Sequence, residues 1–265
     1  MNSSEKMEFI NLAKRVAVIG GQKALSYFRD PDLRIRNKDF DSFDPVTEAD
    51  LASENAMRSC IRSVRPSDTI IGEEKDTFQG SSEFTWVLDP IDGTRAFISG
   101  IPVWTVLVSV SQNGLPICGI IHQPFTQEIF VGGLGVSDYL RGGFSLETSV
   151  RQCHDLKHAL LASTFPEIGT EKEHNAFQKV SKSVRLTRYG MDAYAYALLA
   201  SGYIDVVIEA GLKTYDIQAP IALIEAAGGV VSNWTGGSAL QGGQVLACGD
   251  KRLHKEILDI LDNHV

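Results

Sequence analysis

The chain has 265 residues, of which 43% are hydrophobic, so it can bury a large core in one α/β domain or in two closely joined halves. Acidic residues outnumber basic ones by 33 to 25, and the net charge of −8 disfavours non-specific binding to nucleic acid or anionic membranes. No apolar run is long enough to span a bilayer and the N-terminus is polar, which predicts a soluble, cytoplasmic protein. The cysteines form no CxxC pair, so neither a zinc knuckle nor a disulfide framework is expected.

The first part of the chain predicts two helices followed by two short strands. Apolar residues at helical spacing indicate an amphipathic helix over about residues 8–28, although two consecutive glycines are unfavourable in its middle. The charged segment 34–44 is typical of a loop or short hairpin, and a second helix is expected from Thr47 to about residue 64. Buried strands over residues 69–72 and 84–88 each end at acidic residues.

The remainder of the chain changes pattern near its middle. A short helix is expected over residues 94–98, followed by an antiparallel meander with strands at 103–110, 116–122 and 128–132. Beyond residue 160, strands alternate with helices predicted over 174–180, 193–202 and 217–227. The change favours a boundary near residues 149–156. It divides the chain into an N-terminal half, 1–150, and a C-terminal half, 151–265, that form one compact unit.

The most informative motif is Asp89-Pro90-Ile91-Asp92-Gly93-Thr94, which places two carboxylates and an exposed carbonyl on one sharp turn. Such hard oxygen ligands suit Mg²⁺. Proline fixes one φ angle and glycine permits an unusual one, so the turn can hold its ligands without a conformational search. Asp-Pro and Asp-Gly are also common in ordinary turns, and the motif alone would favour that simpler interpretation.

Three further acidic motifs change that balance. They are Gly72-Glu73-Glu74 at the end of a strand, Thr47-Glu48-Ala49-Asp50 at the start of a helix, and Tyr215-Asp216 before an apolar helix. That helix ends in Ala226-Ala227-Gly228-Gly229. Together the motifs resemble the inositol monophosphatase family over about residues 9–261. The resemblance implies a layered α/β/α/β/α sandwich, Mg²⁺-dependent hydrolysis of a phosphate monoester, and a homodimer.

The resemblance also implies a site for two or three Mg²⁺ ions. Glu73, Asp89 and the carbonyl of Ile91 would hold the first ion, while Asp89, Asp92 and Asp216 would hold the second. Two cations bridged in this way can clamp the attacking water and the leaving oxygen of an in-line displacement. Inhibition by lithium is expected at the second position.

The same resemblance assigns roles beside the metals. Glu73 and Thr94 would orient and help deprotonate the attacking water, with Asp50 accepting a hydrogen bond from the Thr94 hydroxyl. The N–H groups of Gly93 and Thr94 would bind the phosphate at a helix start. Asp50 alone would be interpreted as a helix cap, and Lys38 is as consistent with a solvated lysine as with a phosphate contact.

Three stretches resemble the histidinol-phosphatase branch of the family, namely 92–100, 188–196 and 209–216. Ala96 and Tyr215 stand where inositol-type members commonly carry Asn and Trp. Histidinol phosphate has a cationic amine and an imidazole, so its pocket should offer carboxylates away from the metals. Asp192 and Glu209 are the candidates, and Arg188 is a further candidate for substrate binding.

Several features leave alternatives open. Asp192 could cap the helix that follows it, and Glu209 could pair with a lysine. Met191, Thr214 and Pro220 depart from the branch pattern. Met191 could reshape the pocket, whereas Pro220 is expected in the first turns of its helix, where a missing N–H costs little. An inositol-monophosphatase-like enzyme of broad specificity is the main alternative, and a non-catalytic regulatory relative is a remote one.

Overall fold

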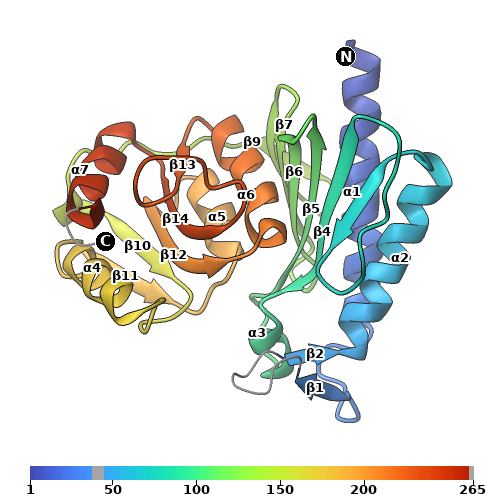
Figure 1. Cartoon of the computed structure of the whole chain (residues 1–265), viewed down its shortest axis with the longest axis horizontal. Helices are drawn as coiled ribbons and strands as arrows, with labels where there is room; N and C mark the ends of the chain where they lie inside the picture. The colour runs from blue at the N-terminus through green and yellow to red at the C-terminus, as the bar shows by residue number, and fades with distance from the viewer. Residues whose placement is uncertain (38–44, 263–265) are drawn as a thin grey trace.

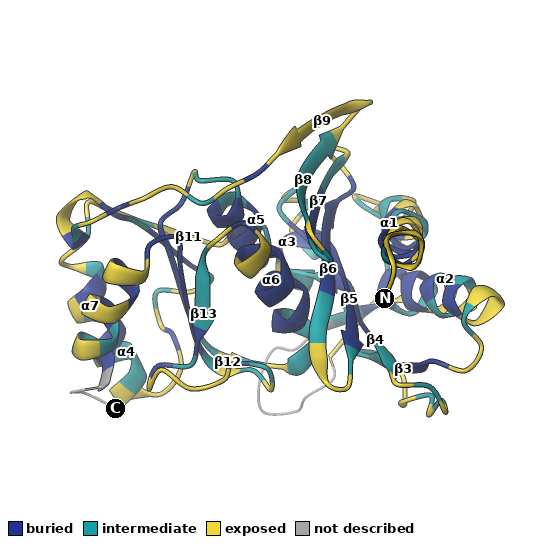
Figure 2. Ribbon diagram, turned by 90° about the horizontal axis from the view of Figure 1, so that it is seen from above, coloured by how far each residue is buried: buried dark blue, intermediate teal, exposed yellow. Residues whose placement is uncertain are grey.

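The computed structural model describes residues 1–37 and 45–262. Its main helices are α1 (Ser3–Leu25), α2 (Glu48–Val64), α4 (Glu171–Ser181), α5 (Tyr194–Ala200), α6 (Thr214–Ala226) and α7 (Lys251–Asp262). In Figure 1, α1 and α2 cover one face of a large sheet, and α5 and α6 lie between it and a second sheet. α4 and α7 cover the outer face of the second sheet, so layers of helix and sheet alternate, as Figure 2 shows from above. The predicted α/β/α/β/α sandwich is confirmed.

The first sheet has seven strands in chain order. They are β3 (Thr69–Gly72), β4 (Phe84–Asp92), β5 (Thr105–Gln112), β6 (Leu115–Gln123), β7 (Glu128–Gly133), β8 (Val136–Arg141) and β9 (Phe144–Glu147). Only β3 and β4 are parallel, so the predicted meander is confirmed over β5 to β7. β8 and β9 were not predicted from the sequence, although apolar and polar residues alternate in Phe144-Ser145-Leu146-Glu147, as in a strand.

The second sheet has five strands in the order β11-β10-β12-β14-β13. They are β10 (Leu160–Ser163), β11 (Leu186–Tyr189), β12 (Val206–Leu212), β13 (Val230–Ser232) and β14 (Gly243–Cys248). β10 runs parallel to both β11 and β12, whereas β14 is antiparallel to its neighbours. Because parallel strands end at the same edge of a sheet, Thr164, just after β10, comes level with Glu209 on β12.

Two consecutive glycines, Gly20 and Gly21, lie near the C-terminal end of α1, where α2 and β6 pack against the helix. A Cβ atom on Gly20 would lie 2.6 Å from the sulfur of Met57, and one on Gly21 would lie 2.6 Å from a ring carbon of His122. The glycines therefore let α1 pack closely on α2 and β6. This packing offsets the cost of about 1 kcal/mol that a glycine carries inside a helix.

The starts of the first two helices are fixed by capping boxes. Asn2 and Glu5 exchange side-chain and backbone hydrogen bonds, so α1 begins earlier than predicted. Thr47 and Asp50 do the same for α2, whose start agrees with the prediction. Before α2, β1 (Ile35–Asn37) and β2 (Pro45–Thr47) pair as an antiparallel hairpin. Within residues 1–37 and 45–262, no helix is both long and apolar enough to cross a bilayer.

α6 is held against the first sheet by two glycines of that sheet. A Cβ atom on Gly119 would lie 2.2 Å from the carbonyl oxygen of Ala219, and one on Gly132 would lie 2.3 Å from the Cα of Leu223. The helix backbone therefore approaches the sheet more closely than any side chain would allow. This contact fixes the position of Asp216, in the first turn of α6.

The prediction for Pro220 is wrong. α6 begins at Thr214, earlier than expected, so Pro220 lies inside the helix and not in its first turn. Proline has no N–H to donate to the carbonyl four residues earlier. The helix nevertheless continues to Ala226, because its residues from Ile217 to Ile224 are buried between the sheets.

Candidate active site

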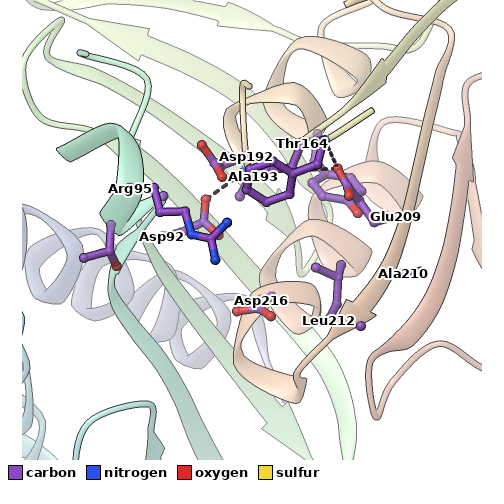
Figure 3. Close-up of a pocket in the computed structure, with 14 residues that line it drawn as sticks. Asp92, Arg95, Thr164, Asp192, Ala193, Glu209, Ala210, Leu212 and Asp216 are labelled. Carbon is purple, nitrogen blue, oxygen red and sulfur yellow. Dashed lines mark hydrogen bonds between the residues drawn. The ribbon is translucent and has the colours of Figure 1, made fainter. Parts of the chain in front are cut away.

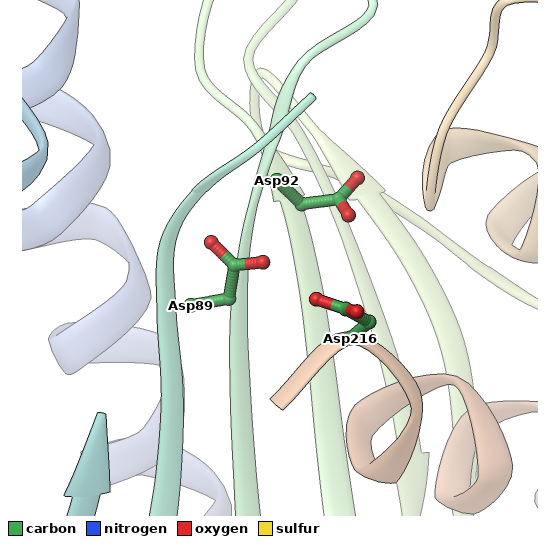
Figure 4. Close-up of side chains that lie close together, drawn as sticks. All are labelled: Asp89, Asp92 and Asp216. Atoms are coloured by element: carbon green, nitrogen blue, oxygen red, sulfur yellow. The ribbon is translucent and has the colours of Figure 1, made fainter. Parts of the chain in front are cut away.

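Three aspartates from distant parts of the chain converge beside the first sheet. Asp89 and Asp92 belong to β4, Asp216 belongs to α6, and each offers an oxygen within 4.8 Å of the others (Figure 4). In a regular strand, residues three apart point to opposite faces. Here the pairing of β4 with β5 is irregular between Asp89 and Asp92, where Pro90 lies. The irregularity lets both side chains serve one site.

The electrostatics of the three aspartates fit a cation. Burial raises the pKa of Asp89 well above its ordinary value, and the charges of Glu73, Asp92 and Asp216 raise it further. Burial also raises the pKa of Asp92, followed by the charges of Asp192 and Asp216. Carboxylates held this close repel one another, and a divalent cation among them would turn that repulsion into attraction.

Backbone donors hold two of these carboxylates in place. Asp216 Oδ2 accepts the N–H of Lys213 at 2.6 Å, at the N-terminus of α6, where the helix dipole favours a negative charge. Asp92 Oδ2 accepts the N–H of Ala193 at 2.6 Å. Since Ala193 precedes α5, this second bond joins the two halves of the chain at the cluster.

Glu73, predicted as a ligand of the first metal, lies at the end of β3, next to the strand that carries Asp89. Glu73 follows β3, which pairs in parallel with β4, and its N–H donates to the carbonyl of Leu88 at 3.2 Å. Its charge reaches Asp89 and Asp50, whose pKa values it raises. The site therefore brings Glu73 to the edge of the aspartate cluster.

The predicted hydrogen bond between Thr94 and Asp50 is not found. The Thr94 hydroxyl donates instead to the carbonyl of Ile91 at 3.1 Å. Asp50 accepts the N–H and the hydroxyl of Thr47, at 2.9 and 2.6 Å, because it completes the capping box of α2. Burial raises the pKa of Asp50 to about 6, and its Oδ1 has no hydrogen-bond partner within residues 1–37 and 45–262.

Beside the cluster lies a pocket of about 290 Å³ lined by both halves of the chain (Figure 3). The first half contributes Asp92 and the segment Gly93 to Arg95, which begins α3 (Thr94–Ile98). The second half contributes residues from β12, α5, α6 and the segments that precede α5 and follow β10, among them Thr164, Phe165, Asp192, Tyr196, Glu209 and Asp216. Two of the predicted metal ligands, Asp92 and Asp216, and both predicted selectivity carboxylates therefore line one pocket.

Asp192 is held in a backbone conformation that side chains rarely adopt. Its φ is +45°, in the left-handed region, and its carboxylate lies against Gly93, where a Cβ would approach Oδ2 to 2.9 Å. Burial raises the pKa of Asp192 to about 6, and Arg95 opposes that rise. Asp192 does not cap α5, because the N-cap is Ala193 and makes no side-chain bond. Strain of this kind gathers at functional sites.

Glu209 is buried on β12, at the side of the pocket formed by the second half. Its Oε1 accepts the N–H and the hydroxyl of Thr164, at 2.7 and 2.9 Å, in place of the lysine considered from sequence. Burial raises the pKa of Glu209 to about 8, against the lowering effect of these two bonds. Without bound cations, Glu209 is therefore protonated at neutral pH, when Asp192 is ionised.

Arg188 and Met191 do not line this pocket. Arg188 lies exposed on β11, an edge strand of the second sheet. Met191 packs into the core between the two sheets. Lys38 lies outside the described residues.

Other pocket residues were not singled out from sequence. The Arg95 guanidinium lies 4.9 Å from the centre of the Phe165 ring, a contact between the two halves. Arg95 follows the Asp89–Thr94 motif directly, and Tyr196 ends the 188–196 stretch, so both could have been found from their neighbours. Thr164 and Phe165 carry no motif, and only the end of a parallel strand could have indicated them.

Known proteins similar to this chain include two curated phosphatases and a solved inositol monophosphatase. The chain is 38% identical to the bifunctional phosphatase IMPL2, chloroplastic, of Arabidopsis thaliana, over all of this chain and 78% of that protein. It is 32% identical to the histidinol-phosphatase of Mycobacterium tuberculosis, over 87% of this chain and 89% of the relative. The structure matches an inositol monophosphatase from Zymomonas mobilis with a TM-score of 0.85 and 36% identity, covering 99% of this chain and all of the other. The profile of the inositol monophosphatase family matches residues 5–265, and the chain therefore belongs to that family of phosphatases.

Proposed function

We propose that this protein is a Mg²⁺-dependent histidinol-phosphate phosphatase, which hydrolyses histidinol phosphate to histidinol and phosphate in histidine biosynthesis. The observation that carries the proposal is a partly buried carboxylate, Asp192, on the pocket wall beside the aspartate cluster. The cluster suits a phosphate held through cations, and Asp192 suits a cationic group a few ångströms away. Two relatives with histidinol-phosphatase in their names support this choice of substrate.

The ligands proposed for the metals are Glu73, Asp89, the Ile91 carbonyl, Asp92 and Asp216. All are hard oxygen donors, which favours Mg²⁺ over softer metals. When bound, the ions would neutralise charge on the phosphate and make a water molecule more acidic. The family resemblance further supports two or three ions, inhibition by lithium at the position of Asp216, and a homodimer.

The remaining steps are assigned to the chain's own groups. Glu73 accepts the proton of the attacking water, and the Thr94 hydroxyl helps to orient that water. The N–H groups of Gly93 and Thr94 donate to phosphate oxygens, with the left-handed φ of +83° at Gly93 turning the backbone toward the pocket. Asp50, in the first turn of α2, lies close enough to Glu73 for the two charges to interact. Phosphoryl transfer depends chiefly on such positioning and charge neutralisation.

Selectivity is assigned to the difference between the two pocket carboxylates. Asp192, whose pKa is about 6, is ionised at pH 7, whereas Glu209, whose pKa is about 8, keeps its proton. Asp192 is thus the group that attracts a substrate amine, in competition with Arg95. Glu209 offers a hydrogen bond without charge.

An inositol-phosphate phosphatase of broad specificity is the second candidate, and the protonated Glu209 favours it. A neutral carboxylic acid donates and accepts hydrogen bonds, which suits the hydroxyl groups of a polyol. The similarity to a relative named as bifunctional also supports this candidate.

The proposal is tested by measuring kcat/KM for histidinol phosphate and for inositol 1-phosphate at pH 7.5. We expect the wild type to prefer histidinol phosphate and Asp192→Asn to lower that preference at least tenfold. Loss of one partner of a desolvated charge pair costs about 2–5 kcal/mol, and about 1.4 kcal/mol corresponds to tenfold. Glu209→Gln should change the preference less, since Glu209 is already neutral.

The exposed Asp76→Asn serves as the matched control, because Asp76 lies outside the pocket. It should leave both rates unchanged. Equal slowing of both esters by Asp192→Asn would assign Asp192 to the support of the metal site. A wild type that prefers inositol phosphate would replace the first candidate by the second.

A further inference from the structure

Tyr196, on α5, carries a buried hydroxyl that has no hydrogen-bond partner among the described residues. The side chain is 2% exposed. In the described part of the chain, four buried side-chain atoms lack a partner, and they belong to Asp50, Trp104, Thr105 and Tyr196. Of these four residues, Tyr196 alone lines the pocket beside the aspartate cluster. A buried hydroxyl without a partner costs free energy, so its retention calls for a reason.

The surroundings of Tyr196 place its hydroxyl toward the acidic side of the pocket. Burial raises the pKa of Tyr196, and the charges of Glu209, Asp92 and Asp216 raise it further, in that order. Tyr196 on α5 and Glu209 on β12 both line the pocket, on the side formed by the second half of the chain. In Figure 3, Glu209 and Thr164 lie together on the side of the pocket away from Arg95. A phenol in this setting keeps its proton and is a hydrogen-bond donor.

The pocket is therefore lined both by an unused donor and by a carboxyl group whose Oε1 is already bonded to Thr164. A ligand group that carries an acceptor and a donor side by side would satisfy both the hydroxyl of Tyr196 and the other oxygen of Glu209. An imidazole, with one bare nitrogen and one N–H, has this character, and so does the hydroxyl of a polyol. An alkyl group has neither.

We propose that Tyr196 is a specificity-determining residue whose hydroxyl donates a hydrogen bond to the non-phosphate end of the substrate. The inference rests on the proposed phosphatase function of the same pocket, but not on which polar ester is the natural substrate. It assigns the Tyr196–Glu209 pair to recognition of a combined acceptor and donor, whereas Asp192 recognises positive charge. Tyr196 makes no contact with the reacting phosphate in this proposal.

The test is Tyr196→Phe, assayed on histidinol phosphate, inositol 1-phosphate and butyl phosphate with saturating Mg²⁺. For the polar ester that the wild type uses best, kcat/KM should fall roughly tenfold, the effect of one buried hydrogen bond. For butyl phosphate it should not change, because an alkyl chain cannot accept from the hydroxyl. The wild-type preference among the esters decides the proposed function, whereas the change on mutation decides the role of Tyr196.

Tyr194→Phe provides a matched control on the same helix. The Tyr194 hydroxyl donates to Glu128 at 2.8 Å, and Tyr194 does not line the pocket. This variant should lower the melting temperature and leave the preference among esters unchanged. Tyr196→Phe should change the preference among esters and leave the melting temperature unchanged, since the free protein loses no hydrogen bond. An unchanged preference in Tyr196→Phe, or equal losses on all three esters, would overturn the proposal.

Discussion

Asp89 combines deep burial with several like charges around it, and this combination is unfavourable without a cation. Its raised pKa means that the folded metal-free protein binds protons more tightly than the unfolded chain does. The contribution of such a carboxylate to stability is therefore unfavourable at high pH and is relieved as the pH falls. Asp92 behaves in the same way. Divalent cations, which require the ionised form, should reverse this dependence.

We predict that Asp89→Asn lowers kcat by more than about 100-fold. Loss of a residue that only hydrogen-bonds to a metal ligand typically costs about 10–100-fold, and Asp89 is proposed as a ligand itself. The metal-free variant should be at least as stable as the wild type, because an amide removes repulsion. In the wild type, Mg²⁺ should raise the melting temperature more at pH 8 than at pH 6, and the variant should lack this rise. Thermal unfolding with and without Mg²⁺ measures both effects, with Asp76→Asn as control. Near-normal turnover by the variant would place the metal elsewhere.

Two residues of the site, Gly93 and Asp92, each serve two purposes. Gly93 has a left-handed φ and also leaves room for the Asp192 carboxylate, so two separate constraints exclude a side chain there. Asp92 lines the cluster and also accepts the N–H that begins α5. Residues of this kind couple the metal site to the substrate pocket.

At the scale of elements, the site depends on how closely α6 approaches the first sheet. Gly119 on β6 and Gly132 on β7 allow the helix backbone to touch the strands. Asp216 is carried by the first turn of that helix, whereas Asp89 and Asp92 are carried by β4. The spacing of the three carboxylates is thus set by a helix–sheet distance, which two glycines hold short.

Gly132→Ala should therefore weaken Mg²⁺ binding without touching a ligand. A methyl group 2.3 Å from the Cα of Leu223 must push α6 outward, and such overpacking costs typically about 1–3 kcal/mol of stability. Calorimetric titration with Mg²⁺ and urea unfolding measure the two effects. Gly114→Ala is the control. A Cβ atom added to Gly114 would meet no atom within 4 Å, but φ there is +81°, so alanine should cost about 1–2 kcal/mol by backbone strain alone. Equal Mg²⁺ affinity in the two variants would contradict the prediction.

At the scale of the whole molecule, the two halves share one core. Leu107, Ile121 and Phe130 of the first sheet pack in a single cluster with residues of α5 and α6, such as Ile217 and Leu223. An isolated N-terminal half would expose this face of its sheet to water. The division near residue 150, which remains a prediction, therefore describes the chain's pattern and not two separately stable domains.

We predict one cooperative unfolding transition. Trp86 and Trp104 are buried in the first half and Trp234 in the second, so fluorescence can follow each half. In Trp234→Phe the signal comes from the first half, and in the double variant Trp86→Phe, Trp104→Phe it comes from the second. For each variant, the urea midpoint by fluorescence should equal the midpoint by far-ultraviolet circular dichroism. Midpoints that separate would show that the halves unfold independently.

The amino-acid sequence by itself determined the features that depend on near neighbours. The turn from Asp89 to Thr94 combines ligand types with proline and glycine, so its chemistry can be read without the fold. The layered architecture was implied by the resemblance of its motifs to a family. The capping box at Thr47 and Asp50 is likewise local, and the structure contains it.

Only the tertiary structure decided which distant groups meet. Arg188 and Asp192 are close in sequence, yet one lies on an exposed edge strand and the other in the pocket, because the chain turns between them at left-handed residues. Thr164 joins Glu209 only through the parallel order of β10 and β12. The approach of α6 to Gly132 depends on packing. Such contacts are fixed by the order of strands and the distances between layers, which no local pattern encodes.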